Sequence, residues 1–166
     1  MGRDFLLKLE LVSNPNMLCV VRAAMERLTE TFGFSAPDCR SVTRAVDEAL
    51  TNIMRHAYCS QLGRPIEVCC HGVRQGTGAR RREGFEILLS DRGPAVNPAK
   101  LRGRPLDEIK PGGLGLHFIR QSMDVVEFKR AKGMNLLRLI KYLQPVKEIE
   151  AGKRRGDLAD FGPANR

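Results

Sequence analysis

Three polar residues, Glu48, Asn52 and His56, recur at every fourth position in the segment 42–58. Residues four apart share one face of an α-helix, so this spacing predicts a polar row along a helix. Apolar residues at helical spacing run beside this row, which places it at a half-buried edge. A carboxylate one turn from an amide suits catalysis at a hard cation, because the amide oxygen can ligate Mg²⁺ while the carboxylate orients or deprotonates a nucleophile. Taken alone, a glutamate and an asparagine at this spacing are more often a solvated helix edge.

A second candidate is Asp91, which ends an apolar strand and is followed by Arg92 and Gly93. A carboxylate at a buried strand end can accept a hydrogen bond from an exocyclic amine such as that of adenine. The same three residues also form an ordinary turn, which is the better interpretation when no other motif is considered.

A third candidate is the glycine-rich segment 111–116, which leads into a helix. Glycines let the backbone approach a phosphate group, and the amide groups and dipole at a helix N-terminus attract anions. Lys110 adds positive charge beside this segment. The sequence matches neither the P-loop nor the dinucleotide-binding fingerprint, and by itself it is a turn at least as often as a phosphate site.

The elements that position these residues follow from hydrophobic periodicity. Helical spacing predicts helices over about 16–32, 37–59 and 114–123, the first two capped by Asn14 and Ser35 and the first ended by Gly33. Strands are predicted over 4–12, 66–71, 85–91, 124–130 and 136–143. Because helices cluster early and strands late, we expect an α+β fold: a two-layer sandwich with one mixed, mostly antiparallel sheet covered on one face by helices.

Composition narrows the class of protein. A chain of 166 residues with 42% hydrophobic and 28% charged residues predicts one globular domain. We expect a cytoplasmic protein, because the chain has no signal peptide and no apolar run long enough to span a membrane. Five cysteines without a C-x-x-C pair predict reduced thiols, mostly packed in the core. The net charge of +9 favours an acidic partner or a polyanion such as a nucleotide; with no Trp, nucleic acid is a poor alternative.

Two segments carry little apolar content. The connection over 94–112 is long for a small domain, which is typical of a functional or disordered loop. The polar segment 146–166 is predicted to be a flexible basic tail, so that residues 1–145 form the domain. We also expect Arg80–Arg82 to form a solvated loop tip between two strands.

The three candidate motifs, in this order, resemble the N, G1 and G2 boxes of the GHKL ATPases. This superfamily includes gyrase, the heat-shock chaperone, histidine kinases and mismatch-repair ATPases. Within it, segments 47–58 and 111–116 resemble the anti-sigma factor serine/threonine kinases of bacterial partner-switching systems. The likeness covers roughly residues 4–143 and implies a histidine-kinase-like ATPase fold, with ATP held between the helices and the sheet.

The resemblance also implies residue roles. Asn52 would ligate Mg²⁺, and Glu48 would act as general base or orient the attacking hydroxyl. Asp91 would bind the adenine amine, with Gly93 leaving room for the ring, and residues 94–112 would form the ATP lid. The choice of the lid cation that reaches the γ-phosphate stays open between Arg102, Arg104 and Lys110. The implied nucleotide-binding residues are Asn52, Asp91, Gly93, Lys110, Gly113, Leu114, Gly115 and Leu116.

The function implied by the resemblance is phosphorylation of a small anti-sigma-antagonist protein by an ATP- and Mg²⁺-dependent serine/threonine protein kinase. Sequestration of a sigma factor and assembly into a homodimer are further implications. Two alternatives stay open. A non-catalytic ATP-binding module that sequesters a regulator would transfer no phosphate, and a histidine-kinase-type catalytic domain would produce acid-labile phosphohistidine on its partner.

Overall fold

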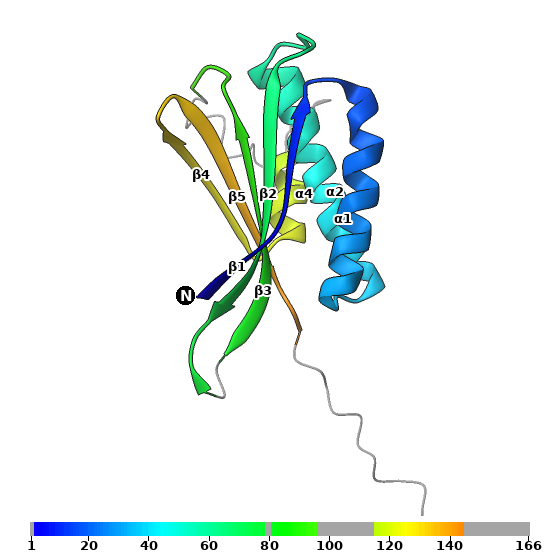
Figure 1. Cartoon of the computed structure of the whole chain (residues 1–166), viewed down its shortest axis with the longest axis vertical. Coiled ribbons are helices and arrows are strands. Elements are labelled where there is room, and N and C mark those ends of the chain that lie inside the picture. The colour runs from blue at the N-terminus through cyan, green and yellow to red at the C-terminus, as the bar shows by residue number, and fades with distance from the viewer. Residues whose placement is uncertain (1, 79–80, 96–114, 145–166) are drawn as a thin grey trace, which may run out of the picture.

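A computed structural model describes residues 2–78, 81–95 and 115–144 of the chain. A five-stranded sheet lies against helices on one of its faces (Figure 1), which confirms the predicted α+β sandwich and its order of elements. The strands stand in the order β1-β2-β3-β5-β4, and every described pairing is antiparallel rather than mixed. Their bounds are β1 Gly2–Val12, β2 Pro65–Gln75, β3 Arg82–Asp91, β4 Val125–Ala131 and β5 Met134–Tyr142.

The first helix ends where the sequence predicts, but the predicted cap, Asn14, begins a short 3₁₀ turn that precedes the α-helix. The side chain of Asn14 accepts a hydrogen bond from the backbone N–H of Asn16 (3.0 Å), and a short 3₁₀ turn, η1 (Pro15–Met17), leads into α1 (Leu18–Phe32). Gly33 ends α1 with a φ of +99°, a conformation that glycine adopts without steric cost.

The second helix has two parts. In α2 (Ala36–Asn52), Ser35 caps the start by accepting a hydrogen bond from the backbone N–H of Asp38 (3.3 Å). Regular α geometry ends at Asn52, and the chain continues as a π-helical turn, η2 (Ile53–Ala57). The predicted helix over 37–59 is therefore correct in place but not in its last turn. Short π turns within helices are frequent at functional sites.

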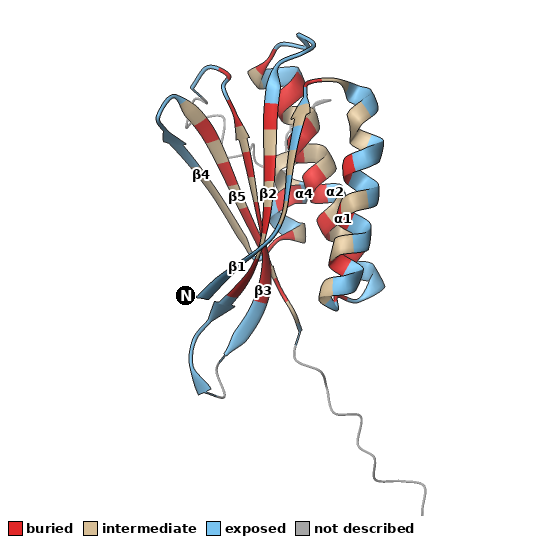
Figure 2. Cartoon of the chain, in the orientation of Figure 1, coloured by how far each residue is buried: buried red, intermediate tan, exposed pale blue. Residues whose placement is uncertain are grey.

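The core lies between the helices and the covered face of the sheet (Figure 2). Helix α2 contributes fully buried residues such as Val46 and Leu50, and α4 (Gly115–Ser122) contributes Ile119. Residues of β3 alternate between the two faces, so Phe85, Ile87 and Leu89 join this core. Each such side chain stabilises the fold by roughly 1.5–3 kcal/mol, which fixes the orientation of the strand.

The turn between β4 and β5 is tighter than predicted. Ala131 pairs with Met134, which leaves only Lys132 and Gly133 in the turn, with φ values of +50° and +79°. Positive φ at both central positions is typical of the two-residue hairpin turn that matches strand twist. Strand β5 therefore starts at Met134 rather than at the predicted residue 136, and Asn135 belongs to the sheet.

The cysteine prediction is partly wrong. All five thiols are free, as expected, but only Cys39 and Cys70 are buried, whereas Cys19 and Cys59 are exposed. Burial raises the pKa of the Cys70 thiol to about 12, so this thiol stays protonated at neutral pH. In the described part of the chain, no helix combines the length and apolar character that crossing a membrane requires.

Three predictions concern segments at the edges of the described ranges. Arg82 belongs to β3 rather than to a loop tip, and its guanidinium lies 4.1 Å from the ring centre of Tyr142. Residues 96–112 of the predicted lid lie outside the described residues, as does the predicted tail over 146–166. Three of the expected phosphate-binding residues also lie outside them: Lys110, Gly113 and Leu114.

Candidate functional site

Helix α2 presents Glu48 and Asn52 side by side. Both are half-buried, next to the fully buried Ala49 and Leu50, so the predicted polar row lies at the edge of the core as expected. The amide nitrogen of Asn52 donates a hydrogen bond to Oε1 of Glu48 (3.2 Å). This bond turns the amide nitrogen toward the carboxylate, which leaves the amide oxygen as the group able to ligate a cation. His56 lies in the π turn and is exposed, so it does not extend the row.

Helix α4 starts against the carboxylate of Glu48. A methyl group added at Gly115 would lie 1.8 Å from Oε1 of Glu48 and 2.6 Å from its Cδ. Only a residue without a side chain lets the first turn of α4 come this close. Leu116, by contrast, is half-buried and packs against the core. The N-box and G2-box residues that are far apart in the sequence are thus in direct contact.

At the end of β3, Asp91 is buried, and hydrogen bonds hold one of its two carboxylate oxygens. Its Oδ1 accepts hydrogen bonds from the backbone N–H of Gly93 (2.8 Å) and from the amide nitrogen of Asn135 (2.9 Å). Within the described parts of the chain, nothing donates a hydrogen bond to Oδ2. A carboxylate oxygen that receives no donor from the surrounding protein is suited to accept one from a ligand.

The turn after Asp91 is clamped to the end of the second helix. The hydroxyl of Tyr58 accepts a hydrogen bond from the N–H of Arg92 (2.8 Å) and donates one to the carbonyl of Pro65 (2.5 Å). A methyl group added at Gly93 would lie 2.7 Å from Cβ of Ala57 and 2.9 Å from its backbone carbonyl oxygen. Glycine is therefore required here by a backbone contact, in addition to the predicted space for a ring.

Comparison with known protein families matches residues 11–141 to the histidine kinase-like ATPase domain. The chain belongs to this family. Similar proteins include those named serine-protein kinase RsbW from Bacillus mycoides (strain KBAB4), Bacillus cereus (strain Q1) and Bacillus anthracis. Each is 25% identical over 146 residues, which span 83% of this chain and 85% of the relative. The resemblance drawn from the three motifs is confirmed, and the family implies that the protein binds ATP.

The next question is whether the residues of this site could hold a Mg²⁺ ion together with a nucleotide. No cluster of three or more His, Cys, Asp or Glu side chains in the described ranges could hold a metal by itself. Mg²⁺ is commonly bound through one or two protein groups together with the phosphates of its nucleotide. The Asn52 amide beside the Glu48 carboxylate fits that arrangement.

Sequence reasoning missed three residues that hold the candidate site around Asp91: Tyr58, Arg130 and Asn135. Tyr58 ends the recognised helix segment, but nothing in its type predicts that its hydroxyl reaches two strands. Asn135 carried a usable signal, since it is the one amide in a strand that is otherwise apolar or basic, next to a lysine–glycine turn. Arg130 pairs with it across that turn.

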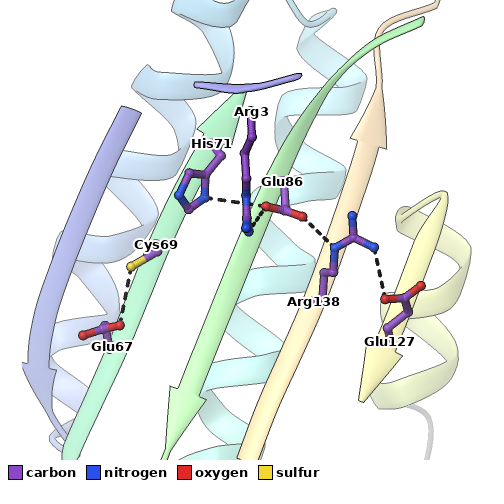
Figure 3. A network of polar contacts seen from close by, with 7 residues as sticks. All are labelled: Arg3, Glu67, Cys69, His71, Glu86, Glu127 and Arg138. Carbon is purple, nitrogen blue, oxygen red and sulfur yellow. Dashed lines mark hydrogen bonds and ion pairs between the residues drawn. The ribbon is translucent and has the colours of Figure 1, made fainter. Parts of the chain in front are cut away.

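The open face of the sheet holds a second buried carboxylate, Glu86, which is 1% exposed (Figure 3). Its Oε1 accepts a hydrogen bond from Nε of Arg138 (2.6 Å), and Arg3 forms an ion pair with its Oε2. Nδ1 of His71 lies 3.6 Å from the same Oε2. Burial lowers the pKa of His71, and the nearby positive charge of Arg3 lowers it further. Arg138 also binds Glu127 (3.0 Å), so the network joins all five strands of the sheet.

Proposed function

We propose that this protein is an ATP- and Mg²⁺-dependent serine/threonine protein kinase of a bacterial partner-switching system. The observation that carries the proposal is the contact between Gly115, at the start of α4, and the carboxylate of Glu48, one turn from Asn52. A phosphate bound at the start of α4 would thereby lie beside a candidate base and a candidate metal ligand. The relatives named serine-protein kinase RsbW support the same activity.

Each residue has a role in this proposal. Asp91 accepts a hydrogen bond from the adenine amine through Oδ2, and Glu48 accepts the proton of the attacking hydroxyl. Asn52 ligates Mg²⁺, which when bound neutralises phosphate charge. Phosphoryl transfer depends mainly on positioning and charge neutralisation, so this small set of groups is sufficient. Phosphate binding is assigned to Gly115 and Leu116 together with Lys110, Gly113 and Leu114.

The proposed partners follow from the resemblance. The phosphoacceptor is a small anti-sigma-antagonist protein, and a sigma factor is a second binding partner of a cytoplasmic homodimer. The net charge of +9 supports a polyanionic nucleotide and an acidic protein partner. Residues 1–145 form the kinase domain in this proposal, and residues 146–166 form a basic tail.

The first test is calorimetric titration of ATP into the full chain with and without Mg²⁺. We expect Mg²⁺-dependent binding that Asn52→Ala weakens about tenfold, since one charge-assisted metal contact is lost. Asn16→Ala is the matched control, because Asn16 is exposed and lies at the start of the first helix. Absence of ATP binding by the wild-type protein would overturn the proposal.

The second test supplies labelled ATP and a recombinant anti-sigma-antagonist protein from the same genome. We expect acid-stable phosphoserine or phosphothreonine, and Glu48→Gln should lower the turnover rate about 100-fold without changing ATP affinity. Glu26→Gln, an exposed substitution on α1, is the control. Acid-labile label would identify a histidine kinase activity instead, and ATP-dependent binding without label would identify a sequestering module.

A further inference from the structure

Asn135 lies on β5, between β3, which carries Asp91, and β4, which carries Arg130. It lies directly opposite Asp91 in the β3–β5 pair and opposite Arg130 in the β4–β5 pair, and it is 8% exposed. Its amide nitrogen donates to Oδ1 of Asp91 (2.9 Å) and to the carbonyl of Pro94 (3.0 Å). Its amide oxygen accepts a hydrogen bond from Nη1 of Arg130 (2.6 Å). Both ends of the amide are therefore in use.

Arg130 decides which way this amide faces. An arginine guanidinium can only donate hydrogen bonds, so it requires the amide oxygen of Asn135 on its side. The amide nitrogen must then face Asp91, where the reverse orientation would bring two acceptors together. The same Nη1 also donates to the carbonyl of Gly93 (3.1 Å), which holds the arginine at the turn. Arg130, Asn135 and Asp91 thus form an ordered chain of donor and acceptor groups.

The consequence for Asp91 is a fixed carboxylate with one committed oxygen. Oδ1 takes two N–H donors, one from Gly93 and one from Asn135, whereas Oδ2 accepts none from the described residues. An acceptor held in one direction discriminates strongly for a base that places a donor there. Adenine carries an amine at its 6-position, guanine carries a carbonyl, and unsubstituted purine carries only hydrogen.

We infer that Asn135, oriented by Arg130, is a positioning residue that directs Oδ2 of Asp91 at the 6-amino group of the bound base. This inference rests on the proposed ATP site. It assigns part of the preference for adenine to a side chain that need not touch the nucleotide. It also explains why a polar residue occupies this position in a strand whose neighbours on the same face, such as Leu137 and Leu139, belong to the core.

The test compares two nucleotides on each protein. The dissociation constants of ATP and of purine riboside triphosphate, which lacks the 6-amino group, are measured by calorimetry on the full chain. Wild type should prefer ATP about tenfold, which is the value of one hydrogen bond to a charged group. Asn135→Ala should bind ATP about tenfold more weakly, while its affinity for the analogue should change little. The ratio of the two dissociation constants should therefore fall to about one. Asn135→Ser keeps a donor and should restore part of the preference.

Two further variants complete the experiment. Arg130→Ala should lower the preference in the same direction, and its side chain is exposed, so its loss does not threaten the fold. Lys129→Ala is the control, because Lys129 is exposed and alternation along β4 places it on the other face of the strand. If Asn135→Ala does not fold, Arg130→Ala and Asn135→Ser give the same readout.

The outcomes separate the inference from the function on which it rests. Equal loss of affinity for both nucleotides in the Asn135 and Arg130 variants would show a merely structural role and overturn the inference. An unchanged preference in both would also overturn it, while ATP binding by the wild type would leave the proposed function intact. Failure of the wild type to bind ATP would overturn both.

Discussion

Strand β3 carries two buried carboxylates, and they face opposite sides of the sheet. Asp91, at the strand end, faces the helices and is held by two neutral N–H donors on one oxygen. Glu86, five positions earlier, faces the open side and lies between two guanidinium groups with a histidine nearby. The two residues have the same functional group on the same strand, and nearly the same burial, at 6% and 1% exposure.

This difference supports the roles proposed for the two residues, a structural one for Glu86 and a ligand-binding one for Asp91. A buried charge is costly unless it is paired, and Glu86 has fixed positive partners that compensate it. Asp91 has no such partner in the described residues, so much of its negative charge and one of its oxygens remain for a ligand. The kind of partner, and not burial alone, separates the two roles.

The largest expected effect follows from Asp91→Asn. An amide at this position would place a donor or a weaker acceptor against the adenine amine, so ATP affinity should fall about 100-fold. The free energy of unfolding should change by less than about 1 kcal/mol, since neutral hydrogen bonds can still form. Calorimetry and urea unfolding measure the two quantities. A large loss of stability with little loss of affinity would reverse the roles assigned to the two carboxylates.

Glu86→Gln should give the opposite result. Removing the negative charge takes away the ion pairs that Glu86 makes with Arg138 and Arg3, which should cost about 2 kcal/mol of unfolding free energy. ATP affinity should stay within about twofold of wild type, because no contact of the nucleotide site is lost. Glu83→Gln, on the same strand but exposed, is the control and should change stability by less than about 0.5 kcal/mol. The comparison would fail if Glu86→Gln weakened ATP binding.

Gly115→Ala tests the contact between the start of α4 and the carboxylate of Glu48, which lies on the helix-covered side of the sheet. The added methyl group would displace the flexible end of Glu48, so the rate of phosphoryl transfer should fall about tenfold with the fold intact. Gln121→Ala, an exposed change on the same helix, should leave the rate unaltered. An unchanged rate in Gly115→Ala would mean that the carboxylate of Glu48 is not needed where the structure places it.

The smallest expected effect is a pH dependence of the free energy of unfolding, caused by His71 on the open face of the sheet. The pKa of His71 is lowered from 6.5 in the folded protein, chiefly by burial and then by Arg3, while the charge of Glu86 opposes the shift. The unfolded chain binds a proton near the ordinary pKa, so the free energy of unfolding should fall as the pH drops below about 6.5. His71→Gln should remove that part of the slope, as measured by urea unfolding at several pH values. A slope equal to that of wild type would exclude His71 as its source.

The sequence predicted the positions of the elements well because their causes are local. Caps at Asn14 and Ser35, the stop at Gly33 and the apolar spacing of α2 each depend on neighbours in the chain. The contacts Glu48–Gly115 and Asp91–Asn135 are different, since they join residues 67 and 44 positions apart. The motif resemblance anticipated that Glu48, Asp91 and Gly115 belong to one site, but no local pattern assigns a partner to Asp91.

The network around Glu86 escaped prediction for a related reason. Glutamate in the strand 85–91 fits an alternating pattern in which polar residues face solvent. The structure buries it because Arg138 and Arg3, which come from β5 and β1, close over that face of the sheet. A sequence pattern records which face a residue is on, but not what covers that face.

The two-residue turn at Lys132 and Gly133 has a practical consequence for engineering. Exposed hairpin tips are usually good places for tags, insertions or new chain ends. Here the turn sets the register that puts Asn135 opposite both Arg130 and Asp91. A shift of one residue in β5 would turn Asn135 to the other face of the sheet. The length of this tip is therefore a constraint that the proposed nucleotide site imposes, and fusion partners are better attached elsewhere.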